Sequence, residues 1–591
     1  MIVERCMGNS PIPQLTDPAV RQRAAAIAAA QGLLERIERD LDAGRREIPV
    51  VSHSLFRRYR RTGNRTDCEA LLAWRSRQTE LAAIACWLGM DRWDWLQDLL
   101  WADCECTWWI YPAHEAHSHP IDLFAAIKAR QQATILRLLE GRLDREVAAR
   151  VKEEIHRRVL SPFLDPARQD FFWKTTTTNW NAVCHAGVAL AAMLVEDDPR
   201  RLDATIRMVL RDLGHFLDGF TPDGGCTEGP SYWRFGFGWY VALAAGLYDF
   251  TGGRINLMTG ERVARICRYP LAVTVRPGVE LEFADAHGGY QSPETAILVN
   301  RFVDVPELFG LCRLTADGSL AVEHLSDLLL YDGRKHPAAE LRNDVWLKDL
   351  GVVKAYTGEL AVGAKAGHNA EHHNHNDVGS LIVYRGGAVF LCDPGAPIYS
   401  ARTFSEKRYE SVYVNSFGHS VPVIEGAGQG HGRQFAGTIA AEGLGGVAGG
   451  GASRAAGEAD GPAKRVRIEM AGAYPVPILK RLTRLIELSP GGKEMALTDS
   501  YEFCQAPSSV QEAFMTTLPA EASADGRSVV IRSESAGAAR LTARAEGSFA
   551  VRELTEESKA ESRTGQLLRR ILFTPAKLAD RMELGFVVKF E

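Results

Sequence analysis

The sequence predicts a multidomain chain in which a helical domain is followed by an antiparallel β domain. Between residues 18 and 330, apolar residues recur mainly at helical spacing. From about residue 345, short β-branched runs bounded by Gly, Pro, Asn and Asp replace this pattern. Helices followed by strands, without alternation, favour two stacked domains over a doubly wound sheet. We therefore expect domains at residues 1–340 and 341–591.

The first half is predicted to consist of irregular helical hairpins. Residues 24–41 are Ala-rich and end near Gly44, and helical spacing recurs at 79–88, 123–139 and 147–159. No repeat period is recognisable, which argues against a TPR-like solenoid. Tryptophans gather between the predicted helices, where core packing is the commoner role and stacking on sugar rings is the alternative.

The second half is predicted to be built from short strands. They are expected at residues 352–356, 380–384, 388–392, 466–470, 481–488 and 529–532. Residues 437–464 are Gly-rich and predict a mobile loop without a catalytic role.

Composition describes an ordinary globular protein. The 591 residues include 46% hydrophobic and 24% charged residues, and the formal net charge is -5. This net charge implies neither a nucleic-acid nor a membrane partner. The eleven cysteines lack regular spacing, which argues for a reducing compartment. No secretory signal is evident, so we expect a cytoplasmic protein, with a secreted or periplasmic one as the alternative if a leader is missing.

The most unusual stretch is the histidine-rich run at residues 371–377. On an extended chain His373, His375 and Asp377 would share one face. The turn predicted at residues 385–387 would return the chain to Asp393 near this run, and His419 follows. Two His nitrogens and a carboxylate oxygen suit a borderline divalent metal such as zinc. A solvated polar turn with unrelated histidines is the alternative.

A second group of polar residues lies at the start of a predicted helix near residue 180. Asn179 or Asn181 is expected to begin this helix. Asn181 and His185 are four residues apart, so both can face one ligand. The alternative is that the Asn caps the helix and His185 is packed in the core.

A third group occupies the Pro/Gly-rich turn at residues 221–236. It carries Asp223, Glu228, Tyr232 and Arg234. Loops that present such groups often carry chemistry. Tyr232 could transfer a proton if a neighbouring cation lowered its pKa. Equally, it could anchor the start of a helix.

Several segments together resemble the heparinase II/III-like polysaccharide lyases. The similar segments, in the family's order, are 108–114, 179–181, 223–232, 373–380, 393–395, 408–409 and 415–419. The resemblance covers roughly residues 50 to 435. It implies an N-terminal (α/α) toroid followed by a C-terminal antiparallel β-sandwich.

The resemblance also implies β-elimination of a uronate-containing polysaccharide. Glycosaminoglycans such as chondroitin, hyaluronan or heparan sulfate are the first expectation, and alginate is the next. Removal of the weakly acidic C5 proton requires fixed donors at the uronate carboxylate, a role that falls by resemblance to Asn181, helped by His373. Tyr232 would act as base, acid or both, with Tyr240 as its rival, and His373 would be the base for the other epimer.

The resemblance further implies one divalent metal, zinc rather than manganese or calcium, with a mainly structural role. Its ligands would be His375, Asp393 and His419, which would hold the loop carrying His373. The expected substrate-binding residues are His114, Trp180, His185, Glu228, Arg234, Tyr399, Arg408 and Tyr409. The expected partner is an acidic polysaccharide or oligosaccharide, without nucleic acid or membrane, and a homodimer stays open.

Two other function classes remain open from the sequence. A glycoside hydrolase on an (α/α) toroid would use two carboxylates, for which Asp223 and Glu228 are the candidates. A non-catalytic glycan-binding protein would keep the aromatic and Arg residues but would tolerate the loss of Tyr232.

Overall fold

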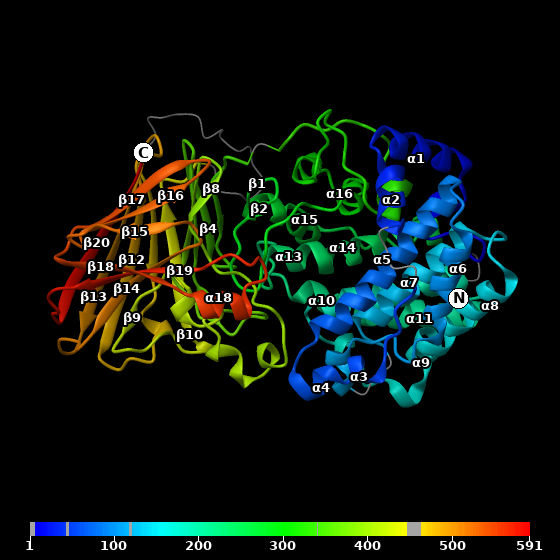
Figure 1. Ribbon diagram of the computed structural model, residues 1–591, viewed down its shortest axis with the longest axis horizontal. Helices are drawn as coiled ribbons and strands as arrows, with labels where there is room; N and C mark the ends of the chain where they lie inside the picture. Colours follow the sequence, from blue (N-terminus) through cyan, green and yellow to red (C-terminus); the bar gives the residue numbers. More distant parts are fainter. Residues whose placement is uncertain (1–5, 43–46, 118–120, 340, 446–462) are drawn as a thin grey trace. The chain divides into compact units, whose positions relative to one another are not determined.

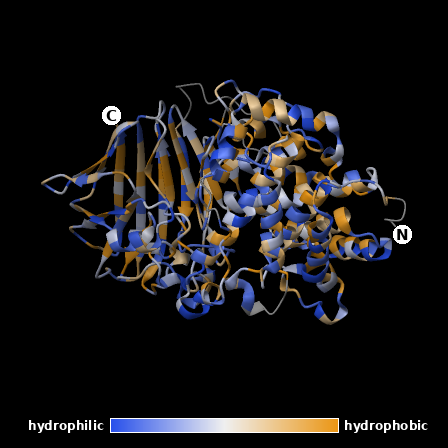
Figure 2. Cartoon of the chain, turned by 45° about the vertical axis from the view of Figure 1, so that its right-hand side comes forward, coloured by the Kyte–Doolittle hydropathy of each residue, from blue (hydrophilic) through white to orange (hydrophobic). Residues whose placement is uncertain are grey.

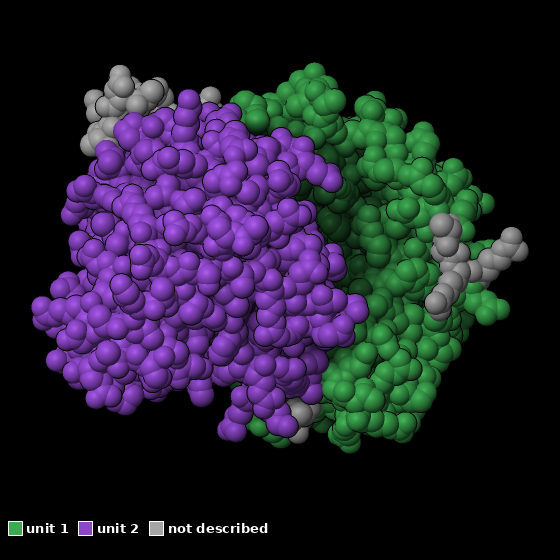
Figure 3. Space-filling model, turned by 60° about the vertical axis from the view of Figure 1, so that its left-hand side comes forward, with its two compact units in different colours: residues 1–220, 232–267, 290–339 green, residues 221–231, 268–289, 340–591 purple. Residues whose placement is uncertain are grey.

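The computed structural model describes residues 6–42, 47–117, 121–339, 341–445 and 463–591. The chain forms two compact units, coloured separately in Figure 3. Unit 1 comprises residues 1–220, 232–267 and 290–339, and unit 2 comprises residues 221–231, 268–289 and 340–591. The helical first half and the antiparallel β-rich second half confirm the predicted fold class (Figure 1).

Unit 1 is built almost entirely from helices. They are α1 (Pro18–Ala30), α2 (Leu33–Asp42), α3 (His53–Phe56), α4 (Arg58–Thr62), α5 (Thr66–Leu88), α6 (Trp93–Glu105), α7 (Leu123–Leu138), α8 (Arg145–Ile155), α9 (Ser161–Leu164), α10 (Asn179–Val195), α11 (Pro199–Asp212), α12 (Gly214–Asp218), α14 (Gly238–Thr251), α16 (Pro293–Asn300) and α17 (Leu325–Leu330). The short helix α13 (Pro230–Tyr232) and helix α15 (Glu261–Val273) each have residues in both units. None of the described helices is long and apolar enough to cross a membrane.

Local sequence explains where these helices begin and end. The single helix expected over 24–41 is broken, because Gly32 takes a φ of +60° between α1 and α2. Helix α10 is apolar on almost all sides, which is typical of a buried helix. A Cβ atom at its Gly187 would lie 2.4 Å from the carbonyl oxygen of Ala126, so only glycine allows α7 and α10 to pack this closely.

Unit 2 contains antiparallel sheets. The largest has the strand order β15-β16-β17-β20-β13-β12-β11-β10-β6, and two others have the orders β18-β19-β14-β9 and β3-β4-β5-β7-β8. The strands are β1 (Thr274–Arg276), β2 (Val279–Glu280), β3 (Val345–Leu347), β4 (Val352–Thr357), β5 (Leu360–Lys365), β6 (Gly367–Asn369), β7 (Leu381–Arg385), β8 (Ala388–Leu391), β9 (Val423–Ile424), β10 (Gly432–Glu442), β11 (Lys464–Glu469), β12 (Leu479–Leu488), β13 (Glu494–Phe503), β14 (Val510–Thr516), β15 (Ala520–Ala522), β16 (Ser528–Ser533), β17 (Gly537–Ala543), β18 (Gly547–Glu553), β19 (Arg569–Pro575) and β20 (Arg581–Phe590). Helix α18 (Thr555–Glu561) also belongs to this unit.

The core of unit 2 lies between sheet faces. Buried and half-buried residues alternate along all of β13, as expected for a strand with one face in the core. Figure 2 shows the corresponding alternation of orange and blue along the strands. Phe390, Phe514, Phe573 and Phe586 are fully buried members of this apolar core.

Two loop regions of unit 2 carry predictions from the sequence, residues 371–377 and the Gly-rich stretch 437–464. The extended conformation expected for residues 371–377 is wrong, because this run is a series of turns in which His373 has a φ of +58°. Asp377 instead pairs with Lys365 at 2.7 Å. In the Gly-rich stretch expected to be mobile, residues 446–462 lie outside the described residues, and its flanks belong to β10 and β11.

A buried arginine ties β12 to these loops. Arg484 is fully buried and pairs with Asp499 of β13, with an Nη2–Oδ2 distance of 2.5 Å. Its Nη1 donates to the carbonyl oxygens of Gly379 and Ser420, at 2.8 and 2.5 Å. These two residues follow the histidine-rich run and His419 respectively, so Arg484 holds both loops against the sheet.

We predict that Arg484→Ala lowers the free energy of unfolding of unit 2 by about 3–5 kcal/mol, because Asp499 would remain buried without its cation. Arg481→Ala on the same strand is the matched control, since the Arg481 side chain is 61% exposed, and it should cost at most about 0.5 kcal/mol. Urea unfolding followed by far-UV circular dichroism measures both. Equal losses in the two variants would contradict the role given to Arg484.

Candidate functional site

In unit 2, the histidine-rich loop converges on one buried carboxylate. Asp285 is fully buried, and its oxygens lie 2.7 Å from Nδ1 of His373 and 2.9 Å from Nε2 of His375. The Tyr399 hydroxyl and Nη2 of Arg408 also donate to it, at 3.0 and 2.9 Å. Burial alone would raise the pKa of Asp285, but the hydrogen bonds from the two histidines and the charge of Arg408 hold it well below its ordinary value.

The backbone around this carboxylate is strained. Ala284 and His373 have φ values of +61° and +58°, a region that side chains other than glycine rarely adopt. The two strained segments are joined by a hydrogen bond from the Asp285 amide to the His373 carbonyl, at 3.2 Å. The Nε2 atom of His373 lies 3.8 Å from a Glu228 carboxylate oxygen. Because Nδ1 faces Asp285, Nε2 is the nitrogen of His373 that can exchange a proton.

The predicted metal ligands lie together. Ligand atoms of His375, Asp393 and His419 are within 4.8 Å of one another, and all three side chains are fully buried. Nδ1 of His419 lies 2.9 Å from Asp393. Nδ1 of His375 and Nε2 of His419 have no hydrogen-bond partner among the described residues. Buried polar atoms are rarely left in this state, so the cluster fits a cation.

The donor set and its surroundings also suit a divalent metal. Burial lowers the pKa of His375, which keeps its ring neutral as a metal ligand requires. On the opposite side of this ring, Nε2 contacts Asp285. A carboxylate behind a ligating histidine fixes the ring orientation in many metal sites. Asp285 therefore connects the cluster to His373.

In unit 1, Asn181 and His185 are not arranged as the sequence suggested. Asn181 is fully buried, and its amide nitrogen donates to the carbonyls of Lys174 and Asp212 at 2.8 and 3.1 Å. His185 is also fully buried, with its ring against Phe163 and Trp173. Burial lowers the pKa of His185 to about 4, so it is neutral. This buried position is the one expected for a packed histidine, the alternative that the sequence left open for His185.

The two candidate tyrosines differ in exposure. Tyr240 is 2% exposed, its hydroxyl donates to the Leu257 carbonyl at 3.0 Å, and burial raises its pKa. Tyr232 is half-buried, at the end of α13. The next turn of the helix brings Gly236 against Asn179, because a Cβ atom at Gly236 would lie 3.0 Å from the Asn179 Cβ. Asn179 therefore packs against the helical segment that follows Tyr232.

The aromatic residues predicted to bind sugar form a cluster at the start of α10. The rings of His114 and Trp180 meet edge to face at 4.6 Å, and Phe172, which is 40% exposed, lies 5.0 Å from Trp180. Nδ1 of His114 is fixed by Asp122 at 2.7 Å. The sequence-predicted pair His114 and Trp180 is therefore brought together, within unit 1.

The remaining predicted residues lie in different parts of the two units. Tyr409 donates to the Asn374 side chain at 2.9 Å and stacks on His431. Arg234 lines a cavity of unit 1. Asp223 accepts hydrogen bonds from the Thr221 hydroxyl and from the amides of Gly225 and Asp349. These donors give Asp223 a loop-fixing role and leave it poorly suited to be a hydrolase carboxylate.

Asp285 is the residue that sequence reasoning missed. It lies 88 positions before His373, within 268–289, the segment of the predicted helical half that folds with unit 2. A weak signal was available. In the run 282–287, Glu282 and His287 lie on either side of an Ala-Asp-Ala sequence, outside any predicted helix.

We predict that the protein binds one zinc ion and that His419→Ala abolishes this binding, because the cluster would lose one of its nitrogen ligands. Equilibrium dialysis against zinc, manganese and calcium, followed by metal analysis, measures it. His215→Ala, at an exposed histidine, is the control and should retain the ion. If the unaltered protein takes up none of the three cations, the cluster is a hydrogen-bonded group only.

Comparisons with known proteins agree with this architecture. No protein-family model matches the sequence, and no curated protein matches it. The crystal structure of heparinase III matches with a TM-score of 0.58 at 10% identity, over 99% of this chain and 93% of that one. The heparan sulfate lyase HepC from Pedobacter heparinus matches with a TM-score of 0.53 at 12% identity, over 100% and 87%.

The chondroitin AC lyase of Streptomyces coelicolor A3, solved with chondroitin sulphate, matches with a TM-score of 0.53 at 11% identity. The match covers 97% of this chain and 82% of that one. Likeness at such low identity bears on the fold. The chain has the fold of the heparinase and chondroitin lyase structures, with a helical part followed by antiparallel sheets.

Proposed function

We propose that the chain is a polysaccharide lyase that cleaves uronate-containing polysaccharides by β-elimination and leaves a 4,5-unsaturated uronate. The observation that carries the proposal is the hydrogen bond between Nδ1 of His373 and the buried Asp285, which makes Nε2 the nitrogen that would accept a proton. A His held in this way by a carboxylate is a typical general base. The shared fold with enzymes named as heparan sulfate and chondroitin lyases supports the same assignment.

The reaction requires a base for the C5 proton, an acid for the departing O4, and donors for the charge that grows on the uronate carboxylate. His373 and Tyr232 are the proposed proton-transfer residues, and the epimer at C5 decides which one is the base. Asn181 was the expected carboxylate donor, but both hydrogens of its amide are used by backbone carbonyls. We therefore assign Asn181 a positioning role at the start of α10.

Glycosaminoglycans are the proposed substrates, with alginate as the second choice. Trp180 is the proposed aromatic face for a sugar ring, and the buried His114 packs edge to face against it. Tyr399 donates its one hydroxyl hydrogen to Asp285, so its proposed role is to orient the loop. Arg408 also donates to Asp285, and its proposed role is both to orient the loop and to contact the acidic sugar. Of the five N–H groups of Arg408, four already donate to Asp285, to the Asn374 carbonyl and to the Thr403 carbonyl, which leaves one Nη1 hydrogen for a carboxylate.

Zinc is the proposed metal. His375, Asp393 and His419 would hold it, and its charge would cross-link three loops of unit 2. The proton transfers are assigned to the side chains of His373 and Tyr232. Asp285 would connect metal binding with proton transfer, because it contacts both the proposed ligand His375 and the proposed base His373.

We predict that Tyr232→Phe lowers the rate of unsaturated-product formation by about 10²–10⁴-fold, because the phenol proton is lost from the reaction. Tyr240→Phe is the matched control and should retain activity, since its hydroxyl serves only the Leu257 carbonyl. Ultraviolet absorbance of the new double bond, measured on a panel of uronate polymers, reports the rate. Full turnover by Tyr232→Phe would end the tyrosine-centred proposal.

We also predict that Asp285→Asn lowers turnover by about 10²–10⁴-fold, because an amide can no longer hold His373 in the tautomer that carries its hydrogen on Nδ1. Zinc content, measured in parallel, separates this effect from loss of the metal. Asp223→Asn is the control and should keep its activity. If Asp223→Asn is inactive instead, and products carry no double bond, the glycoside hydrolase alternative would replace the lyase.

A further inference from the structure

The segment that follows α18 is joined to residues 397–402 of unit 2 by an isolated antiparallel bridge. The Ile398 amide donates to the Glu561 carbonyl at 2.8 Å. The Glu561 carboxylate is held in turn, because it lies 3.3 Å from Nη1 of Arg402. The backbone just before Arg563 is therefore fixed beside this loop.

Arg563 places its guanidinium over the ring of Tyr399. Its Cζ atom lies 4.2 Å from the ring centroid, a distance at which a cation is attracted to an aromatic face. The Arg563 side chain is exposed, and it forms neither a hydrogen bond nor an ion pair with any described residue. Its five N–H groups are therefore available to a ligand.

Tyr399 connects Arg563 to the proposed site around Asp285. The Tyr399 hydroxyl donates to Asp285 at 3.0 Å, and its ring stacks on that of His373 with the centroids 6.2 Å apart. His373 and Arg563 thus both contact Tyr399. The guanidinium is therefore no more than one aromatic ring away from the proposed base.

An exposed aromatic ring lies beside both Tyr399 and His373. Phe404 is 51% exposed, and its ring meets the rings of Tyr399 and His373 edge to face at 4.9 and 6.2 Å. The C–H face of a sugar can pack on such a ring while a nearby guanidinium binds an acidic substituent. This part of unit 2 is therefore suited to an acidic saccharide.

The position of Arg563 indicates which acidic group it would bind. A uronate whose C5 faces His373 carries its own carboxylate beside that residue, where Arg408 keeps one Nη1 hydrogen. Arg563 contacts Tyr399 instead of Asp285, so it would meet the neighbouring sugar. In uronate-containing glycosaminoglycans this neighbour is an amino sugar, whose acidic groups are sulfates. A guanidinium suits a sulfate because it can donate two parallel hydrogen bonds.

We propose that Arg563 binds a sulfate group on the sugar next to the uronate at His373, so that the protein prefers sulfated glycosaminoglycans. This inference rests on the proposed lyase function. It names the substrate class within that function, and it assigns a specificity-determining role to a residue of the segment between α18 and β19.

The test compares the unaltered protein with Arg563→Ala and Arg563→Gln on two matched pairs of polymers, chondroitin with chondroitin sulfate and heparosan with heparan sulfate. For the pair that is cleaved, both variants should raise the KM for the sulfated polymer at least about tenfold, because a charged contact is lost. The kcat and the KM for the unsulfated polymer should stay unchanged. A lower kcat on both polymers would overturn the inference, because it would show that Arg563 acts only by positioning Tyr399.

Lys577→Ala is the matched control. The Lys577 side chain is 88% exposed and follows β19, whereas Arg563 precedes this strand. The variant therefore removes one positive charge at the opposite end of β19, and its KM for the sulfated polymer should equal that of the unaltered protein. Thermal unfolding verifies that every variant is folded.

Isothermal titration separates this inference from the proposed function. Hexasaccharides of chondroitin sulfate and heparan sulfate, and their unsulfated counterparts, are titrated into the Tyr232→Phe protein, which leaves the probes intact. Addition of Arg563→Ala should weaken binding of the sulfated probe at least about tenfold and should leave binding of the unsulfated probe unchanged.

Equal affinity for the sulfated probe with and without Arg563 would overturn the inference, even if unsaturated products are formed. Failure of the sulfated probes to bind would also overturn it, as would cleavage of alginate alone, because alginate carries no sulfate. Absence of unsaturated product from every polymer would refute the lyase proposal instead, and the titration would still decide whether Arg563 binds a sulfated saccharide.

Discussion

The candidate site of unit 2 depends on one buried carboxylate. Asp285 accepts hydrogen bonds from two histidines, a tyrosine and an arginine, and none of its surface reaches solvent. A charge buried in this way is costly unless it is fully paired, so the surrounding loops must keep their positions. The positive φ values of Ala284 and His373 indicate that the backbone is held in strained conformations to satisfy it.

Asp285 contacts both a predicted metal ligand, His375, and the proposed base, His373. His375 contacts Asp285 through Nε2. Its Nδ1, on the opposite side of the ring, belongs to the cluster of His375, Asp393 and His419 and has no hydrogen-bond partner among the described residues. His373 contacts the second oxygen of Asp285. A cation in the cluster would therefore fix the orientation of the proposed base through two hydrogen bonds. Arg484 adds a second restraint, because it holds the loops after both histidine segments against the sheet.

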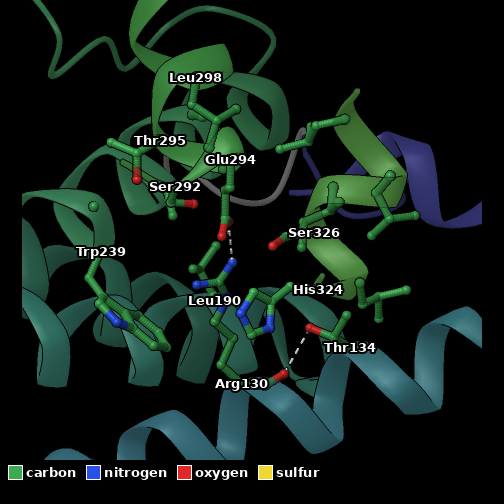
Figure 4. A pocket seen from close by; sticks show the side chains of 18 of the residues that line it. Arg130, Thr134, Leu190, Trp239, Ser292, Glu294, Thr295, Leu298, His324 and Ser326 are labelled. Atoms are coloured by element: carbon green, nitrogen blue, oxygen red, sulfur yellow. Dashed lines mark hydrogen bonds and ion pairs between the residues drawn. The ribbon is translucent and has the colours of Figure 1, made fainter. Parts of the chain in front are cut away.

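Unit 1 offers groups of a different kind. Its helices carry an aromatic cluster at the start of α10, a half-buried tyrosine and a cavity lined by apolar side chains and by ion pairs such as Arg130–Glu294 (Figure 4). Rigid helices can present such groups with little positional freedom, which favours specific recognition of a sugar. The sequence identity to the matching lyase structures is only 10–12%. The specificity of this chain therefore depends on its own side chains.

The sequence by itself determined the fold class and the metal-type cluster. Hydrophobic periodicity is a local property, so helices of the first half and strands of the second could be read from neighbouring residues. The resemblance to the heparinase II/III-like family implied the set His375, Asp393 and His419, and the structure brings these three residues together. Tertiary structure decided the rest. Asp285 joins His373 across 88 positions, and packing buried His185, Asn181 and Tyr240 while leaving Tyr232 half-buried. Burial and hydrogen-bond partners depend on residues far apart in the chain, so no local pattern could specify them.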